Sequence, residues 1–215
     1  MTQPSFDSPE AVHIYFDFLC PYAWRGLELA DVLRRDHGHT FALRHFSLVQ
    51  GNHPENAESR HHPVWWLTEQ QGGGSEMLDE SLRAFLADKA AARQGEDARW
   101  RFALALLRAR HRDAASLDAA TVQAAANQAG LNLGEFEADL EGDEARRAEL
   151  RSDLAAAAEL GVFGTPTFAL PSGHAAYFRF ANLVPPEGAL AAWQLYVSVL
   201  ESDARIETIK RAKRA

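Results

Sequence analysis

The chain has 215 residues, 47% of them hydrophobic, so it can bury a sizeable core without disulfides or a structural metal. Its formal net charge of -8 at pH 7 argues against a nucleic-acid-binding protein, which would present a basic face. Residues 1–10 lack the basic start and apolar stretch of a signal peptide, and no apolar run is long enough for a membrane span. A single cysteine cannot form an internal disulfide, and alone it says nothing about the compartment. Together these features favour a cytoplasmic protein with no membrane or nucleic-acid partner.

The first part of the chain predicts a β-α-β unit. Residues 12–18 alternate and are rich in β-branched and aromatic side chains, which is typical of a strand. Cys20 and Pro21 follow, and because proline is favoured at the first helical position, a helix is predicted to begin there and to end at residues 37–38. Residues 41–48 form the second predicted strand. Such a unit is expected to be parallel and right-handed.

Residues 54–160 carry almost no strand signal, and their apolar residues recur at steps of three and four, which indicates helices. Glycines at 72–74, 130 and 142 separate the helical segments. The helices are predicted at residues 76–92, 97–111, 116–129 and 143–160.

Strand signals return at residues 165–170 and 176–180, joined by a turn, so these segments predict a β-hairpin. Pro185 and Pro186 then open a last helix. The order β-α-β, helical block, β-β-α predicts an α/β fold in which a helical domain interrupts a two-part sheet.

Cys20 is the candidate nucleophile. It stands where a predicted strand gives way to a helix, so a thiolate there would face unpaired backbone N–H groups and the positive end of the helix dipole. A reactive thiol in this place should also be accessible. The alternative is a buried, unreactive cysteine, since free cysteine is among the most buried residue types. From the residue and its setting alone, both interpretations stay open.

Thr165 and Pro166 lie at the head of the predicted hairpin, where a proline does not have to donate to a central strand ladder. Because only about 5–6% of X–Pro bonds are cis, this proline taken alone indicates a trans turn.

Two segments together resemble the thioredoxin superfamily, and more narrowly its DsbA-like branch: Phe-Asp-Phe-Leu-Cys-Pro-Tyr-Ala-Trp at 16–24 and Gly-Val-Phe-Gly-Thr-Pro-Thr-Phe at 161–168. The resemblance implies that Cys20 attacks disulfides, that Pro166 belongs to a cis-proline loop beside it, and that the backbone of Thr165 pairs with an extended substrate. It also implies a thioredoxin-like domain over residues 11–55 and 161–204, an inserted helical domain over 56–160 and a basic tail over 205–215. The predicted substrate contacts are Pro21, Tyr22, Trp24, Trp65, Trp66, Thr165 and Pro166.

The chain departs from this branch at Ala23, where disulfide-exchanging members carry the second cysteine that resolves a mixed disulfide. It also resembles the kappa-class glutathione transferases and the 2-hydroxychromene-2-carboxylate isomerases, which have Ser-Pro-Tyr at this point and activate a bound glutathione thiol. The isomerase-like Gly-x-Asp-Arg pattern is replaced by Phe-Ala-Asn-Leu at 180–183, which weakens the isomerase interpretation.

Three functions therefore stay open: a monothiol redox protein or thiol transferase using Cys20, a glutathione-dependent transferase or isomerase on a small hydrophobic substrate, and a non-catalytic peptide-binding module beside Pro166. No tightly bound cofactor is expected. Glutathione or another low-molecular-weight thiol would serve as co-substrate, and the partner would be a protein disulfide or a small-molecule thiol. The sequence leaves the oligomeric state open.

Other candidate residues carry weaker signals. His53, His61 and His62 lack a recognised metal-ligand spacing, so a solvated histidine-rich loop is expected there and no metal. Trp65 and Trp66 are candidates for the wall of a substrate cleft that the helical block would form over Cys20, although aromatic residues in a helical block are mostly core.

Overall fold

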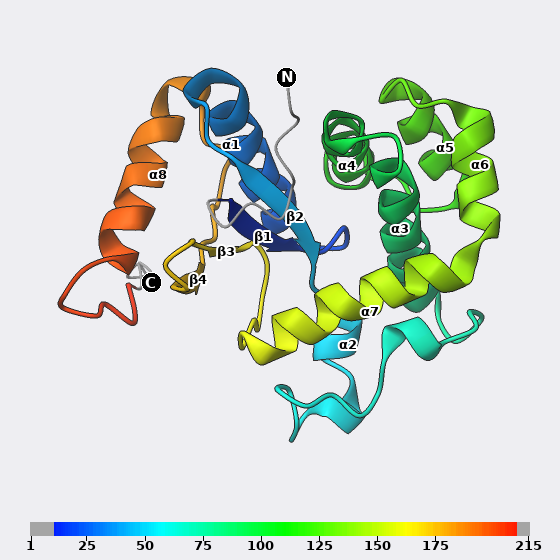
Figure 1. Ribbon diagram of the computed structural model, residues 1–215, viewed down its shortest axis with the longest axis horizontal. Coiled ribbons are helices and arrows are strands. Elements are labelled where there is room, and N and C mark those ends of the chain that lie inside the picture. Colours follow the sequence, from blue (N-terminus) through cyan, green and yellow to red (C-terminus); the bar gives the residue numbers. More distant parts are fainter. Residues whose placement is uncertain (1–10, 210–215) are drawn as a thin grey trace.

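A four-stranded sheet carries the fold, in the order β2-β1-β3-β4 (Figure 1). The computed structural model describes residues 11–209. β1 (Val12–Phe16) pairs in parallel with β2 (Phe41–His45) and antiparallel with β3 (Thr167–Ala169). β3 in turn pairs antiparallel with β4 (Ala175–Tyr177). The predicted α/β fold, with a parallel β-α-β unit and a C-terminal hairpin, is confirmed.

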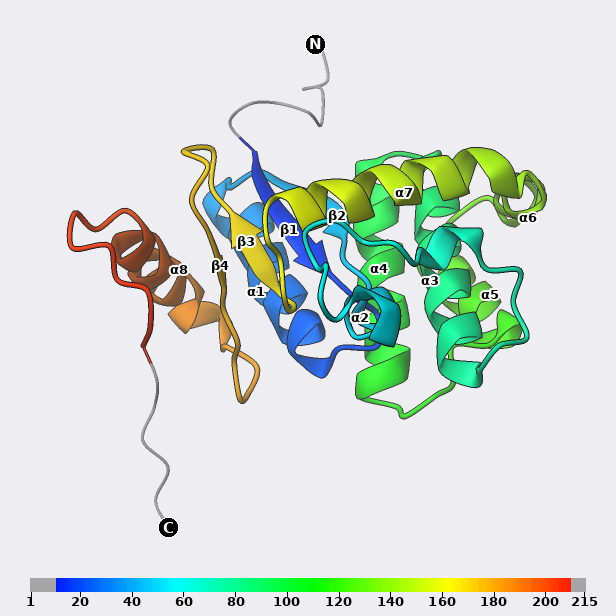
Figure 2. The ribbon, with the colours of Figure 1, turned by 90° about the horizontal axis from the view of Figure 1, so that it is seen from below.

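Helices surround this sheet and form a block beyond β2 (Figure 1). α1 contacts α8 on one side and α4 of the block on the other. α7 runs from the block back to the sheet, where it contacts β2 (Figure 2). The helices are α1 (Pro21–His37), α2 (Leu48–Gly51), α3 (Glu76–Ala92), α4 (Glu96–His111), α5 (Ala119–Gln128), α6 (Leu133–Glu141), α7 (Asp143–Glu159) and α8 (Pro186–Leu200), with short 3-10 turns at Pro54–Asn56 and Leu67–Glu69.

The sheet and the helical block share one hydrophobic cluster. Fully buried side chains run from Ile14 and Phe16 on β1, through Leu27 on α1, to Phe85 and Phe102 in the block. Because the cluster is continuous, burial of these apolar side chains holds the block in a set position against the sheet. The division into a thioredoxin-like domain and an inserted domain at residues 56–160 stays a proposal.

Both N-terminal strands end earlier than predicted. Asp17 and Phe18, expected in the first strand, lie in a turn, because the Asp17 carboxylate accepts hydrogen bonds from the backbone N–H groups of Leu19 (2.8 Å) and Leu48 (2.6 Å). β2 stops at His45, and the Ser47 hydroxyl instead caps the short helix α2 by accepting a bond from the N–H of Gln50. The C-terminal strands are likewise shorter than predicted, at three residues each.

The helical block contains one helix that the sequence did not predict, α6. Asn132 caps it by accepting a hydrogen bond from the N–H of Glu135, and Phe136 anchors it as a fully buried side chain. The glycines at 130 and 142, which separate helical segments in the sequence, flank this helix. The helix expected from 116 begins at Ala119, because Asp118 caps it.

Two expectations concern chain ends that the structure describes only in part. The absence of a signal peptide concerns residues 1–10, and the basic tail extends through residues 210–215; both of these ranges lie outside the described residues. Across residues 11–209, no helix combines the length and the apolarity that crossing a membrane requires.

Candidate functional site

Cys20 occupies the N-terminal cap of α1. Its backbone is extended (φ -97°, ψ 116°), and its carbonyl accepts bonds from the N–H groups of Ala23 (3.1 Å) and Trp24 (3.3 Å). Pro21 takes the first helical position and is exposed. The first N–H groups of a helix have no intrahelical acceptor. The thiol therefore lies where partial positive charge from the helix end favours an anion.

The cis-proline segment lies directly beside this cysteine. The Thr165–Pro166 bond is cis, and the Cys20 Sγ donates a hydrogen bond to the Thr165 carbonyl oxygen at 3.3 Å. α1 approaches the loop at Gly26, where a Cβ atom would lie 2.5 Å from the Pro166 Cγ. Within a helix, glycine is less favourable than alanine, so a glycine at position 26 indicates that another segment packs closely against α1 there. The site predicted from the sequence did not include this residue. It lets the helix and the loop meet.

The site is more enclosed than the sequence indicated. Cys20 is 5% exposed, which corrects the expectation of an accessible thiol, because its sulfur is turned toward the Thr165 carbonyl. Thr165 is 1% exposed, and its hydroxyl has no hydrogen-bond partner. Within the described chain, the Thr165 N–H also donates to no backbone carbonyl. Unpaired polar groups of this kind are available to a substrate.

Aromatic and cationic side chains line the exposed side of the site. The Tyr22 ring lies 5.4 Å from the Arg25 guanidinium carbon and 4.7 Å from that of Arg179. Burial raises the pKa of Tyr177, the nearby Arg179 charge opposes that rise, and a Cys20 thiolate would add to it, so the tyrosine lies close to both residues. Phe163, 65% exposed, packs edge-on against the same tyrosine ring.

The structure places Trp24 mainly between helices. Its indole N–H donates to Glu28 (2.8 Å), and its ring stacks on His111 of α4. The imidazole of His111 in turn lies 2.8 Å from the Phe18 carbonyl oxygen. Trp24 thus ties α1 and the turn before Cys20 to the helical block.

Trp65 and Trp66 have partners of their own. Trp65 stacks on His53 with 4.0 Å between ring centroids, and the Arg151 guanidinium lies 3.4 Å from the Trp66 centroid. Within residues 11–209, none of their hydrogen bonds or ring contacts involves Cys20 or Pro166. Their assignment as a substrate wall stays a prediction.

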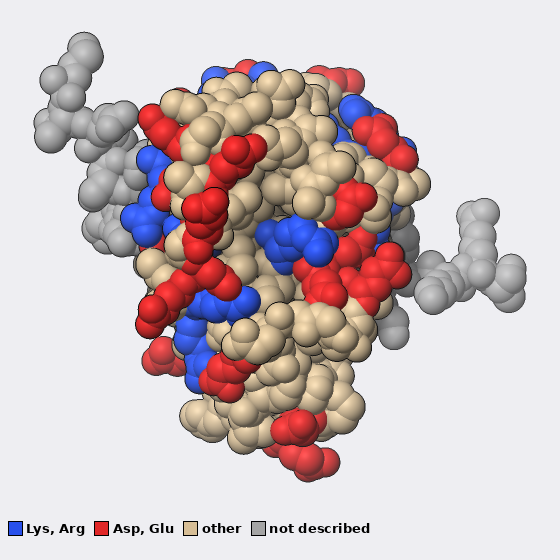
Figure 3. Space-filling view, turned by 90° about the vertical axis from the view of Figure 1, so that its right-hand side faces the viewer, with Lys and Arg blue, Asp and Glu red and all other residues tan. Residues whose placement is uncertain are grey.

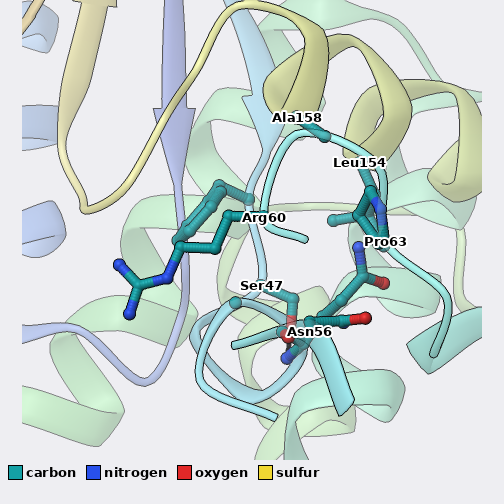
Figure 4. A pocket seen from close by; sticks show the side chains of 9 residues that line it. Ser47, Asn56, Arg60, Pro63, Leu154 and Ala158 are labelled. Atoms are coloured by element: carbon teal, nitrogen blue, oxygen red, sulfur yellow. Dashed lines mark hydrogen bonds between the residues drawn. The ribbon is translucent and has the colours of Figure 1, made fainter. Parts of the chain in front are cut away.

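Two hollows in the molecule lie apart from Cys20. One, of about 20 Å³, has room for about one water molecule and lies beside α2 (Figure 4). The Arg60 guanidinium points out of it, away from Ser47 and Asn56 (Figure 4). The other, of about 510 Å³, lies between α4 and the C-terminal half of α1, where Asp31 and arginines line it. Neither is lined by Cys20 or Pro166.

Two of the three loop histidines have separate partners, and His62 is exposed. His53 stacks on Trp65, and the imidazole of His61 lies 3.2 Å from the Ala158 carbonyl oxygen. In the part of the chain that is described, no three histidine, cysteine or acidic side chains are grouped to hold a metal ion.

Comparison with known proteins gives one family. Residues 11–183 match the family described as DSBA-like thioredoxin domain. No sequence among the curated proteins matches this chain.

Several solved structures share the fold. A probable DsbA oxidoreductase from Streptomyces coelicolor is 21% identical, with a TM-score of 0.58, over 95% of this chain and 94% of that one. The cytosolic disulfide reductase DsbM from Pseudomonas aeruginosa, in a structure with GSH, is 20% identical, with a TM-score of 0.59, over 87% and 98%. A 2-hydroxychromene-2-carboxylate isomerase is 17% identical, with a TM-score of 0.56, over 92% and 100%. At such identities the likeness establishes the fold alone.

Proposed function

The chain belongs to the family of DSBA-like thioredoxin domains, and from that premise we propose that it is a monothiol thiol-disulfide oxidoreductase or transferase with Cys20 as its nucleophile. The observation that carries the proposal is the contact of the Cys20 Sγ with the Thr165 carbonyl at the cis-proline loop, in a chain with no second cysteine. The helix end supplies the positive potential that a thiolate needs.

The proposed reaction has two exchange steps. The Cys20 thiolate attacks one sulfur of a disulfide, a new S–S bond forms, and the other sulfur leaves as a thiolate. A second low-molecular-weight thiolate then attacks the mixed disulfide, releasing Cys20 and carrying away the first substrate half as a disulfide. Glutathione is the thiol we propose for this second step. Electrons pass from the incoming thiol to the first disulfide, and Cys20 returns to its starting state.

The burial of Cys20 favours small substrates. At 5% exposure the sulfur leaves little room for a folded protein, whereas a small disulfide can reach it along the Thr165 backbone. The unpaired N–H of Thr165 can donate to an extended substrate in the manner of an added strand. No cofactor is needed for this chemistry. A cytoplasmic location belongs to the same proposal, because thiols are kept reduced there.

Replacement of the nucleophile tests the proposal. Cys20→Ser should abolish the reduction of glutathione mixed disulfides. A coupled assay would measure this activity, in which a second enzyme reduces the glutathione disulfide that forms. If the variant retains that activity, the proposal is wrong. Conjugation of an aryl halide to glutathione that survives in Cys20→Ser would instead favour the transferase. Peptide binding that survives the substitution in a protein without either activity would favour the binding module.

The missing resolving thiol gives a second test. Ala23 is fully buried one turn along α1 from Cys20, and Ala23→Cys would place a second sulfur there. We expect this pair to close into a disulfide under oxidant and to gain insulin-reducing activity, provided that the two residues meet disulfide geometry. Free thiols would be counted before and after oxidation. A dithiol that stays open while Cys20 still reacts would mean that the site lacks redox geometry.

A further inference from the structure

Two positively charged side chains lie near Cys20 without acidic partners, although the protein as a whole is acidic. The chain carries a net charge of -8, yet the guanidinium groups of Arg25 and Arg179 form no salt bridge with any carboxylate in residues 11–209. Arg25 donates one bond, to the Phe180 carbonyl (3.1 Å), and Arg179 is exposed. A guanidinium has five N–H donors, so most of the donors in this pair are not used within the protein.

Most arginines elsewhere in the described chain have acidic partners. Arg108 forms a two-pronged pair with Glu28 at 2.6 Å, and Arg34 contacts two aspartates. On the face formed by the helical block, basic and acidic side chains lie interspersed (Figure 3). Arg83 and Arg101 lack an acidic partner, but each donates to a backbone carbonyl. Arg25 and Arg179 are among the described arginines without such a partner, and they are the two that lie over the Tyr22 ring beside Cys20.

Geometry places these two arginines within reach of one substrate. The Tyr22 ring, two residues after the nucleophile, holds both guanidinium groups within 5.4 Å of its centroid. Arg179 follows β4, and the end of that strand packs on the cis-proline loop, since a Cβ atom at Gly164 would lie 3.5 Å from the Tyr177 ring. Two elements far apart in sequence, α1 and the segment after β4, thus present cations to the same tyrosine ring, two residues from Cys20.

We propose that Arg25 and Arg179 form an anion subsite that binds the carboxylate of a small disulfide or thiol reacting at Cys20. The inference rests on the proposed function and narrows its substrate class to compounds that carry a carboxylate. Guanidinium groups suit this ligand because their planar donors match the two carboxylate oxygens, and charge-assisted bonds of this kind are stronger than neutral ones.

A comparison of an anionic disulfide with a neutral one tests the subsite. Mixed-disulfide formation at Cys20 would be timed by intact mass with glutathione disulfide, which is anionic, and with 2-hydroxyethyl disulfide, which is neutral. The variants are Arg25→Gln, Arg179→Gln and the double variant. Arg93→Gln is the matched control, because it also removes one positive charge but lies in α3's cap, paired with Glu149. Alkylation by iodoacetamide checks that each variant keeps a reactive thiol.

The double variant should react on the order of tenfold more slowly with glutathione disulfide, which corresponds to losing one charged hydrogen-bonded pair. Its rate with 2-hydroxyethyl disulfide should stay within about twofold of the parent, as should both rates of Arg93→Gln. If the parent reacts with both disulfides and the double variant slows neither or slows both equally, the subsite is wrong while the proposed function stands. If the parent's Cys20 reacts with neither disulfide, the proposed function itself fails.

Discussion

Two charged regions of the molecule differ in how completely their charges are paired. At the end of β2, His45 is fully buried between two aspartates, with its ring nitrogens 3.0 Å from Asp88 and 3.2 Å from Asp153. Lys89 (2.5 Å from Asp153) and Arg99 (2.8 Å from Asp88) complete this buried cluster. At the Cys20 site, by contrast, Arg25 is half-buried and Arg179 is exposed, and neither has an acidic partner within residues 11–209.

The electrostatics of the buried cluster show what complete pairing does. Burial alone would raise the pKa of Asp153, but the hydrogen bond and charge of His45 and the charge of Lys89 more than offset it and lower that pKa. The pKa of Asp88 is likewise lowered, because Arg99 and His45 outweigh its burial. The ion pairs of this cluster join α3, α4 and α7 to the end of β2. Cations without partners are instead free to bind a ligand.

The largest expected effect is on stability, at the buried cluster. Asp153→Asn leaves Lys89 and His45 without their shared carboxylate, and removing one partner of a buried ion pair costs about 3–5 kcal/mol. The free energy of unfolding in urea would measure it. Glu149→Gln, in the same helix but in a surface pair with Arg93, is the control and should cost at most about 1 kcal/mol. If the two variants lowered the free energy of unfolding equally, the buried cluster would stabilise the protein no more than a surface ion pair does.

Asp17 lies between the two regions, and it predicts a pH dependence. Burial raises its pKa to about 6, although the N–H groups of Leu19 and Leu48 and the charge of His45 oppose the rise. Between the unfolded value of about 3.9 and about 6, the folded chain holds a proton that the unfolded chain has lost. This contribution to stability is therefore full below pH 4 and is lost as the pH rises through 6, by about 3 kcal/mol in total.

The comparison with Asp17→Asn isolates this effect from other titrating groups. The stability of the parent relative to Asp17→Asn should fall by about 3 kcal/mol between pH 4 and pH 7. Unfolding free energies of both proteins at several pH values would provide the difference. A difference that does not change with pH would mean that Asp17 ionises as it does in water.

A smaller effect is expected at the contact between α1 and the cis-proline loop. Gly26→Ala would force a Cβ atom into Pro166 and cost about 1–3 kcal/mol, as overpacking does, while slowing mixed-disulfide formation at Cys20. Gly188→Ala in α8 is the matched control, because its Cβ would have only ordinary contacts, none closer than 3.7 Å. That control should be neutral or slightly stabilising. Thermal unfolding and the exchange rate would be compared, and a Gly26→Ala protein indistinguishable from the control would contradict the close approach.

Hydrophobic periodicity was sufficient to predict the order of the elements and the parallel β-α-β unit, because long helices and alternating strands have strong local signals. Short elements such as α6 were missed, since a nine-residue helix in a segment bounded by Gly130 and Gly142 looks like a loop unless the Asn132 cap is recognised. The meeting of Cys20 with Thr165 came from the family resemblance rather than from local pattern.

The rest of the candidate site depends on tertiary contacts. That Tyr177 and Arg179 lie near Cys20 follows from how the hairpin meets the helix, which strand register decides and a single sequence does not give. Arg25 offered a local signal, since it follows Tyr22 at a spacing of three on α1, where helical side chains are neighbours. The burial of Cys20 could not be read from its position at a helix start.

The central claim, that Cys20 is a nucleophile without a resolving partner, is tested most directly by intact mass spectrometry. After treatment with glutathione disulfide, the protein should gain the mass of one glutathionyl group, Cys20→Ser should gain none, and added glutathione should restore the original mass. Because no second cysteine is present to attack the bond, the adduct should persist when the oxidant is removed. A parent protein that keeps its unmodified mass, with a thiol that remains free, would contradict the account.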